Sequence, residues 1–130
     1  MKPSDFFTRS EANDGKRMPL SLPDGTPTDE WLLIRGVDSD EFRAALDEHR
    51  RAVVENAAID DAADRAEANR VSALKLHCAL VAGWSFDAEL TQKALQELFT
   101  EAPHLAAEAD SFASSRQRFF RKGSASSAKD

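Results

Sequence analysis

The sequence predicts a mainly helical fold that begins with a β-hairpin, and three observations carry this prediction. Alanine has the highest helix propensity and supplies 22 of the 130 residues, whereas glycine and proline supply only five each. Between residues 38 and 82 the chain contains neither glycine nor proline. Upstream of that stretch, apolar and polar residues alternate from residue 18 to residue 22, which is the period of a half-buried strand.

Residues 16–36 are expected to form the β-hairpin. Its turn is supplied by Pro23-Asp24-Gly25-Thr26-Pro27, and a second strand follows at 31–34. Because Pro19 cannot donate a backbone hydrogen bond, the first strand should lie at the edge of a sheet. Two strands alone are marginal in water, so this hairpin must pack on the helices or pair with another chain.

Residues 40–82 are expected to form one long helix, continuous or kinked. Either Asp38 or Ser39 can cap its N-terminus, and the acidic residues that follow suit the positive end of a helix. The middle third has Ile59 as its only large apolar residue. This third is interpreted as a solvated spacer within one helix, or as the hinge between two. Gly83 should end the helix.

Two shorter helices should complete the domain. Thr91 can cap a helix over 92–101, and Pro103 suits the start of a last helix that runs from His104 to Phe120. The expected core of this half consists of Trp84, Phe86, Leu98, Phe99 and Phe112.

The two ends of the chain are expected to be flexible. Residues 1–15 are interpreted as an arm and residues 123–130 as a tail, which leaves 16–122 as a single domain. Leu, Ile, Val and Phe make up only about a fifth of the chain, close to the lower limit for an ordered domain. Self-association or a partner could therefore complete the small core.

The charge balance and the cysteine content restrict the function classes. A net charge of −6 argues against a general nucleic-acid binder, although residues 116–130 carry about +4. This basic end is interpreted as a solubilising terminus or as a contact for an acidic partner. Cys78 is the single cysteine, which favours a reducing compartment. We expect no signal peptide and no membrane span, since the longest apolar stretch is 78–84, and we expect a cytosolic protein.

No sequence pattern points to catalysis, a metal or a cofactor. His49, His77 and His104 lie in separate segments, and Cys78 has no CxxC partner. The five glycines are isolated, so no glycine-rich loop is available for a phosphate group. These absences predict a protein that binds other proteins and is not an enzyme.

Aromatic residues exceed what a small core needs, and two pairs adjoin the polar ends of the chain. These pairs, Phe6-Phe7 and Phe119-Phe120, either contact a partner or pack on the chain's own core. Basic residues flank the second pair. The candidate protein-binding residues are Phe6, Phe7, Trp84, Arg116, Arg118, Phe119 and Phe120.

The chain contains several short motifs, each of which occurs once. They are Leu22-Pro23-Asp24-Gly25, the stretch from Gly36 to Phe42, Leu80-Val81-Ala82-Gly83-Trp84-Ser85, Leu90-Thr91 leading to Leu98-Phe99, Ala102-Pro103 and Arg116-Gln117-Arg118-Phe119-Phe120. In this order and spacing, over about 100 residues, the chain resembles the tail assembly chaperones of long-tailed bacteriophages. The alanine-rich stretch 57–70 contributes nothing specific to the resemblance.

The resemblance implies a role before the virion is complete, in the cytoplasm of the host cell. Such proteins coat the tape measure protein, keep it soluble and bring tail tube protein to it, and they are lost from the mature tail. In some relatives a ribosomal frameshift near the C-terminus appends a domain that reaches the tube protein. Two alternatives stay open: a structural tail or neck protein of the virion, and a small regulatory protein that binds nucleic acid through the basic end.

Overall fold

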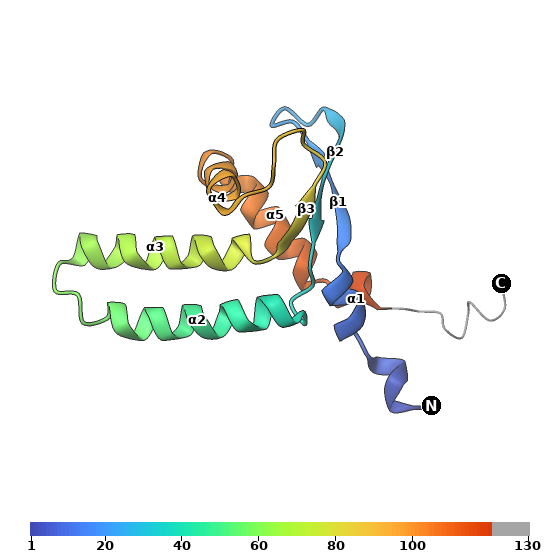
Figure 1. Ribbon diagram of the computed structural model, residues 1–130, viewed down its shortest axis with the longest axis horizontal. Helices are drawn as coiled ribbons and strands as arrows, with labels where there is room; N and C mark the ends of the chain where they lie inside the picture. The colour runs from blue at the N-terminus through green and yellow to red at the C-terminus, as the bar shows by residue number, and fades with distance from the viewer. Residues whose placement is uncertain (121–130) are drawn as a thin grey trace.

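The computed structural model describes residues 1–120 and confirms the mainly helical fold with an N-terminal β-hairpin (Figure 1). The predicted tail 123–130 lies outside the described residues. In chain order the elements are η1 (Pro3–Phe6), α1 (Arg9–Asp14), β1 (Lys16–Ser21), β2 (Pro27–Ile34), α2 (Asp40–Asn56), α3 (Ala62–Cys78), β3 (Val81–Trp84), α4 (Gln92–Glu101), α5 (Pro103–Ser114) and η2 (Arg116–Phe119).

The sheet has three antiparallel strands in the order β1-β2-β3. As predicted, the strand that contains Pro19 is an edge strand. The second edge, β3, was not predicted, because Gly83 was interpreted as the end of a helix. Instead, Gly83 pairs with Leu33 of β2, and the Arg35 side chain donates hydrogen bonds to the Ala79 and Val81 carbonyl oxygens at 3.0 and 3.2 Å. Pairing of β3 with β2, a strand distant in the sequence, therefore ends α3 at Cys78.

The prediction of one long helix over 40–82 is wrong: the segment forms two antiparallel helices, α2 and α3, as in the alternative with a hinge. Ser39 caps α2 by accepting a hydrogen bond from the Phe42 backbone N–H at 3.2 Å. Asp61 caps α3 in the same way, accepting from the Asp64 N–H at 2.9 Å. An extended residue at Asp61 cannot continue α2, so the chain reverses at the stretch that lacks apolar anchors.

The two later helices cover one face of the sheet and carry much of the core. Thr91 caps α4 as predicted. The last helix, α5, ends at Ser114 and not at Phe120, because Ser115 has φ −84° and ψ 91° and turns the chain into η2. Buried residues of the sheet and of these helices meet in one cluster: Met18, Leu20, Leu32, Ile34, Val81, Leu95, Phe99, Leu105, Ala109 and Ala113. Of the five predicted core residues Phe99 is buried, whereas Trp84, Phe86, Leu98 and Phe112 pack at the edge of the cluster.

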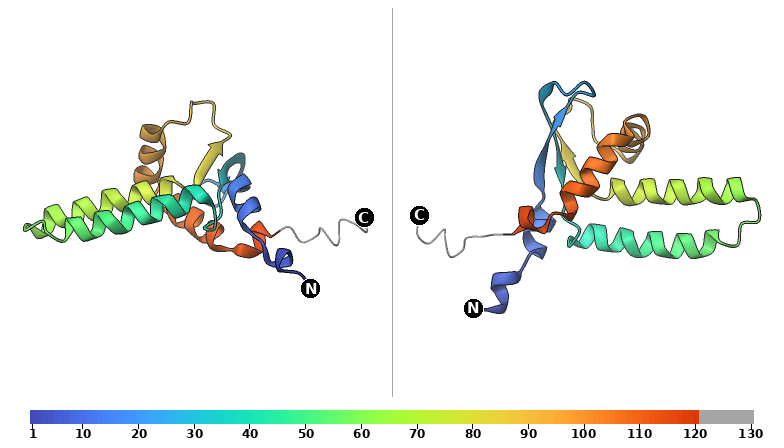
Figure 2. Two further views of the ribbon diagram at one scale, coloured as in Figure 1. Left: turned by 60° about the horizontal axis from the view of Figure 1, so that its bottom comes forward. Right: turned by 180° about the vertical axis from the view of Figure 1, so that it is seen from behind.

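Part of the predicted N-terminal arm belongs to the folded domain. Residues 9–14 form α1, and Ala12 of this helix is fully buried. The Gly36 backbone N–H donates to the Ala12 carbonyl oxygen at 3.0 Å, which fixes α1 beside the start of α2. Residues 1–7 are exposed. Figure 2 shows α1 and η2 side by side at one end of the sheet, so the two ends of the described chain meet there.

Candidate protein-binding surface

The Phe119-Phe120 pair is divided between the core and the surface. Phe119 is 1% exposed, and its ring meets the Phe112 ring edge to face with 6.2 Å between centroids. Phe120, the next residue, is 41% exposed. Phe119 therefore closes the chain's own core, which was one of the two interpretations of the pair, and Phe120 alone is available to a partner.

A shallow cavity of about 420 Å³ brings Phe120 together with the N-terminus. Phe6, which is 69% exposed, lines the same cavity, and Phe7 beside it in the sequence is 65% exposed. We call this site the terminal cavity. The surface exposed inside it is almost entirely apolar, although four of its seven lining residues carry polar groups; the seven are Met1, Asp5, Phe6, Thr8, Arg116, Gln117 and Phe120. Three predicted site residues, Phe6, Arg116 and Phe120, thus meet although they come from opposite ends of the sequence.

Two carboxylates at the start of α2 hold the ends of the chain together. Asp38 accepts a hydrogen bond from the Thr8 hydroxyl at 2.7 Å and two from the Arg116 guanidinium at 2.8 and 3.0 Å. Asp40 accepts two from the Arg9 guanidinium at 2.7 and 2.8 Å. The terminal cavity is therefore assembled on α2, with Asp38 as the common anchor of its N-terminal and C-terminal walls.

The pKa of Asp38 is lowered from its ordinary value, chiefly by the hydrogen bonds from Arg116 and further by the bond from Thr8. A carboxylate whose pKa is lower in the folded than in the unfolded chain stabilises the fold above its unfolded pKa. This contribution disappears as the pH falls through the lowered pKa. The anchor should therefore weaken in acid.

An Asp38→Asn variant is expected to lose about 1 kcal/mol of unfolding free energy at pH 7, because the negative charge is lost and the amide NH2 group cannot accept the hydrogen bonds that the second carboxylate oxygen accepts. The difference from the wild type should shrink as the pH falls through the lowered pKa, because Asp38 itself then becomes protonated. Urea unfolding at pH 7 and in acid measures this difference. Asp40→Asn is the matched control, with a smaller effect expected because Asp40 and Arg9 are both largely exposed. An equal loss at both pH values would contradict the assignment.

The other two predicted site residues lie elsewhere. The Arg118 guanidinium carbon lies 4.3 Å from the centroid of the Phe112 ring, so its side chain packs along α5. Trp84, on β3, meets Phe86 edge to face with 5.2 Å between centroids, and its indole N–H donates to the Ala88 carbonyl oxygen at 2.8 Å. Neither residue lines the terminal cavity.

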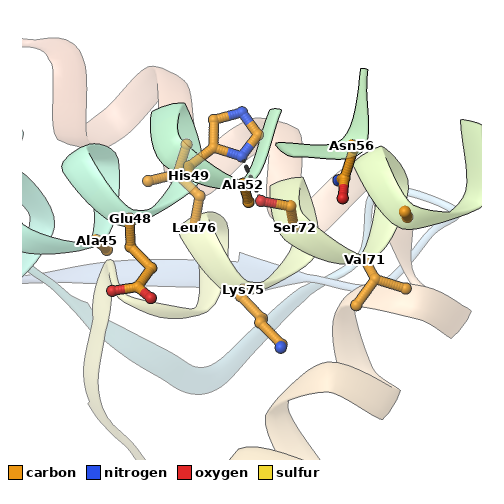
Figure 3. Close-up of a pocket in the computed structure, with 10 residues that line it drawn as sticks. Ala45, Glu48, His49, Ala52, Asn56, Val71, Ser72, Lys75 and Leu76 are labelled. Atoms are coloured by element: carbon orange, nitrogen blue, oxygen red, sulfur yellow. Dashed lines mark hydrogen bonds between the residues drawn. The ribbon is translucent and has the colours of Figure 1, made fainter. Parts of the chain in front are cut away.

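A further cavity of about 430 Å³ lies between α2 and α3 (Figure 3). We call it the hairpin groove; it is lined from α2 over 45–56 and from α3 over 68–76. His49 and Ser72 meet across it with 2.7 Å between Nδ1 and Oγ, and the Asn56 amide donates to Asn69 at 3.0 Å.

The His49–Ser72 contact has the residue types of a nucleophile and its base, but the rest of such a site is missing from residues 1–120. No described carboxylate hydrogen-bonds His49. Ser72 lies in the middle of α3, where backbone N–H groups are used within the helix and cannot stabilise an oxyanion. We interpret the contact as one that joins two helices.

The single cysteine is a core residue. Cys78 is 1% exposed, and burial raises the pKa of its thiol to about 11, so the nucleophilic thiolate is scarce at neutral pH.

In the described part of the chain, no group of three or more His, Cys, Asp or Glu side chains is arranged to hold a metal ion. No helix within residues 1–120 is long and apolar enough to cross a membrane.

Sequence reasoning did not identify the anchor of the terminal cavity. Asp38 and Asp40 were interpreted as part of a helix start, and their partners Arg9 and Arg116 lie far away in the chain. The charge pattern alone could not have paired them.

Comparison with models of protein families, with curated proteins and with solved structures gives no match to this chain.

Proposed function

We propose that the chain is a non-catalytic tail assembly chaperone of a long-tailed bacteriophage, which binds the tape measure protein through the terminal cavity in the host cytoplasm. The observation that supports this proposal most directly is the exposure of Phe6 and Phe120 around one apolar cavity. Aromatic side chains exposed together in this way mark a surface that is covered by a partner.

The composition of the terminal cavity indicates the chemistry of the partner segment. Its apolar lining suits the apolar stripe of an amphipathic helix, such as that of a tape measure protein. Arg121 and Lys122 follow Phe120 in the sequence, so acidic residues beside the stripe would be favoured. A product extended by frameshifting from about Lys122 could reach the tail tube protein.

The experiment is co-expression with the tape measure protein of the same phage. A double variant, Phe6→Ser with Phe120→Ser, is expected to bind it at least about tenfold more weakly, because burial of each Phe is worth about 1.5–3 kcal/mol. The soluble fraction of the tape measure protein and its co-purification with the chain are the two measurements.

Val54→Ser is the matched control, because Val54 is 75% exposed and lies on α2, away from the terminal cavity. The control should behave as the wild type. Undiminished solubility and co-purification with the double variant would overturn the assignment of the surface. Detection of the chain in purified virions would contradict the chaperone role and favour a structural tail or neck protein.

A further inference from the structure

The helical hairpin formed by α2 and α3 projects from the sheet as a two-helix arm (Figures 1 and 2). Its only buried residues, Phe42 and Cys78, lie at the ends that join the body of the protein. From residue 43 to residue 77 no side chain is buried. Since helices are stabilised in proteins mainly by burial of an apolar face, two helices whose apolar residues stay at most partly buried are incompletely packed.

The hairpin groove is the open face of this arm. Its volume of about 430 Å³ and its mainly apolar lining suit side chains that a further pair of helices would insert in a four-helix bundle. The bonds His49–Ser72 and Asn56–Asn69 join α2 to α3 within the arm, so they fix the spacing of the two helices before anything is added.

The two rims of the hairpin groove carry opposite charges. Glu48 lies on the α2 rim, and Lys75 lies on the α3 rim; Figure 3 shows both side chains extending to the same side of the groove. The two whole helices differ in net charge in the same sense. In α2 five carboxylates accompany three arginines, whereas in α3 two carboxylates accompany three basic residues.

We propose that the hairpin groove is the interface between two copies of this chain. A twofold axis that runs along the groove places α2 of one copy against α3 of the other, antiparallel, and closes a four-helix bundle. The same operation places Glu48 opposite Lys75 of the second copy, twice per dimer. The surface is therefore complementary to itself in charge. Within residues 1–120 Lys75 has no ion-pair partner, and Glu48 has only a long contact of 3.4 Å to Arg51.

The test is sedimentation velocity of the full chain over a wide range of concentration. The wild type is expected to dimerise. The single variants Glu48→Lys and Lys75→Glu should each raise the dimer dissociation constant about tenfold or more, because each places two pairs of like charges across the interface. The double variant with both substitutions, and a mixture of the two single variants, should dimerise as the wild type does.

Both positions are exposed, so the variants should keep the wild-type circular dichroism spectrum. A wild-type chain that stays monomeric at all concentrations overturns the proposal, and so does a double variant that fails to recover dimerisation. The proposal stands apart from the terminal cavity: the Phe6→Ser and Phe120→Ser variant should dimerise normally. Failure of one proposal therefore leaves the other intact.

Discussion

Replacement of Phe119 by Ala is expected to lower the free energy of unfolding by about 3–5 kcal/mol, as large-to-small substitutions of buried aromatic residues do. Phe119 is 1% exposed, and its ring fills the space beside Gly36 and against the Phe112 ring. The surrounding α1, α5 and η2 can close only part of the space left behind. A loss of this size is a large fraction of the stability of an ordinary domain.

Phe120→Ala is the matched control, because it removes the same side chain one residue later. Phe120 is 41% exposed, so the loss should stay within about 1 kcal/mol. Urea unfolding followed by circular dichroism gives both values. Equal losses for the two variants would contradict the division of the pair between core and surface.

The Phe119-Phe120 pair also shows where prediction from the sequence ends. Phe119 and Phe120 are the same residue type and adjacent in the chain, and both were candidates for partner contact. The extended backbone at Ser115 starts the 3-10 turn η2, which directs Phe119 inward, and that turn depends on the fit beside Gly36.

Local signals in the sequence predicted local structure well. Ser39 and Thr91 cap the helices they were expected to cap, and the Pro19 strand is at an edge. The strand β3 was missed because it depends on pairing between Gly83 and Leu33, which lie far apart in the chain. Helix propensity alone extends α3 through residues 79–82, and tertiary pairing overrides it.

The candidate site was predictable in its residues but not in its assembly. Exposed aromatics beside polar ends indicated Phe6 and Phe120. That both line one cavity follows from Asp38, which bonds Thr8 from one end of the chain and Arg116 from the other. Hydrogen bonds between residues so distant in sequence leave no periodic pattern, so composition and spacing cannot reveal them.

Gly36→Ala is the second substitution expected to have a large effect, with a loss of about 1–3 kcal/mol in unfolding free energy. A Cβ at residue 36 would lie 2.8 Å from the Ala12 Cβ and 3.0 Å from the Phe119 ring. Neither neighbour can move freely, since Ala12 is fixed by its own backbone and Phe119 is packed on all sides. The close contact of α1 with the start of α2 therefore requires glycine here.

A double-mutant cycle with Ala12→Gly tests this explanation by chemical unfolding. Ala12→Gly alone should cost roughly 1 kcal/mol, because glycine is unfavourable within a helix. In combination with Gly36→Ala it removes the closest of the clashing atoms, so the double variant should be more stable than the two separate losses add up to. The contact with Phe119 persists, and recovery should be partial. Strict additivity would mean that the loss at Gly36 comes from its backbone and not from the packing of α1.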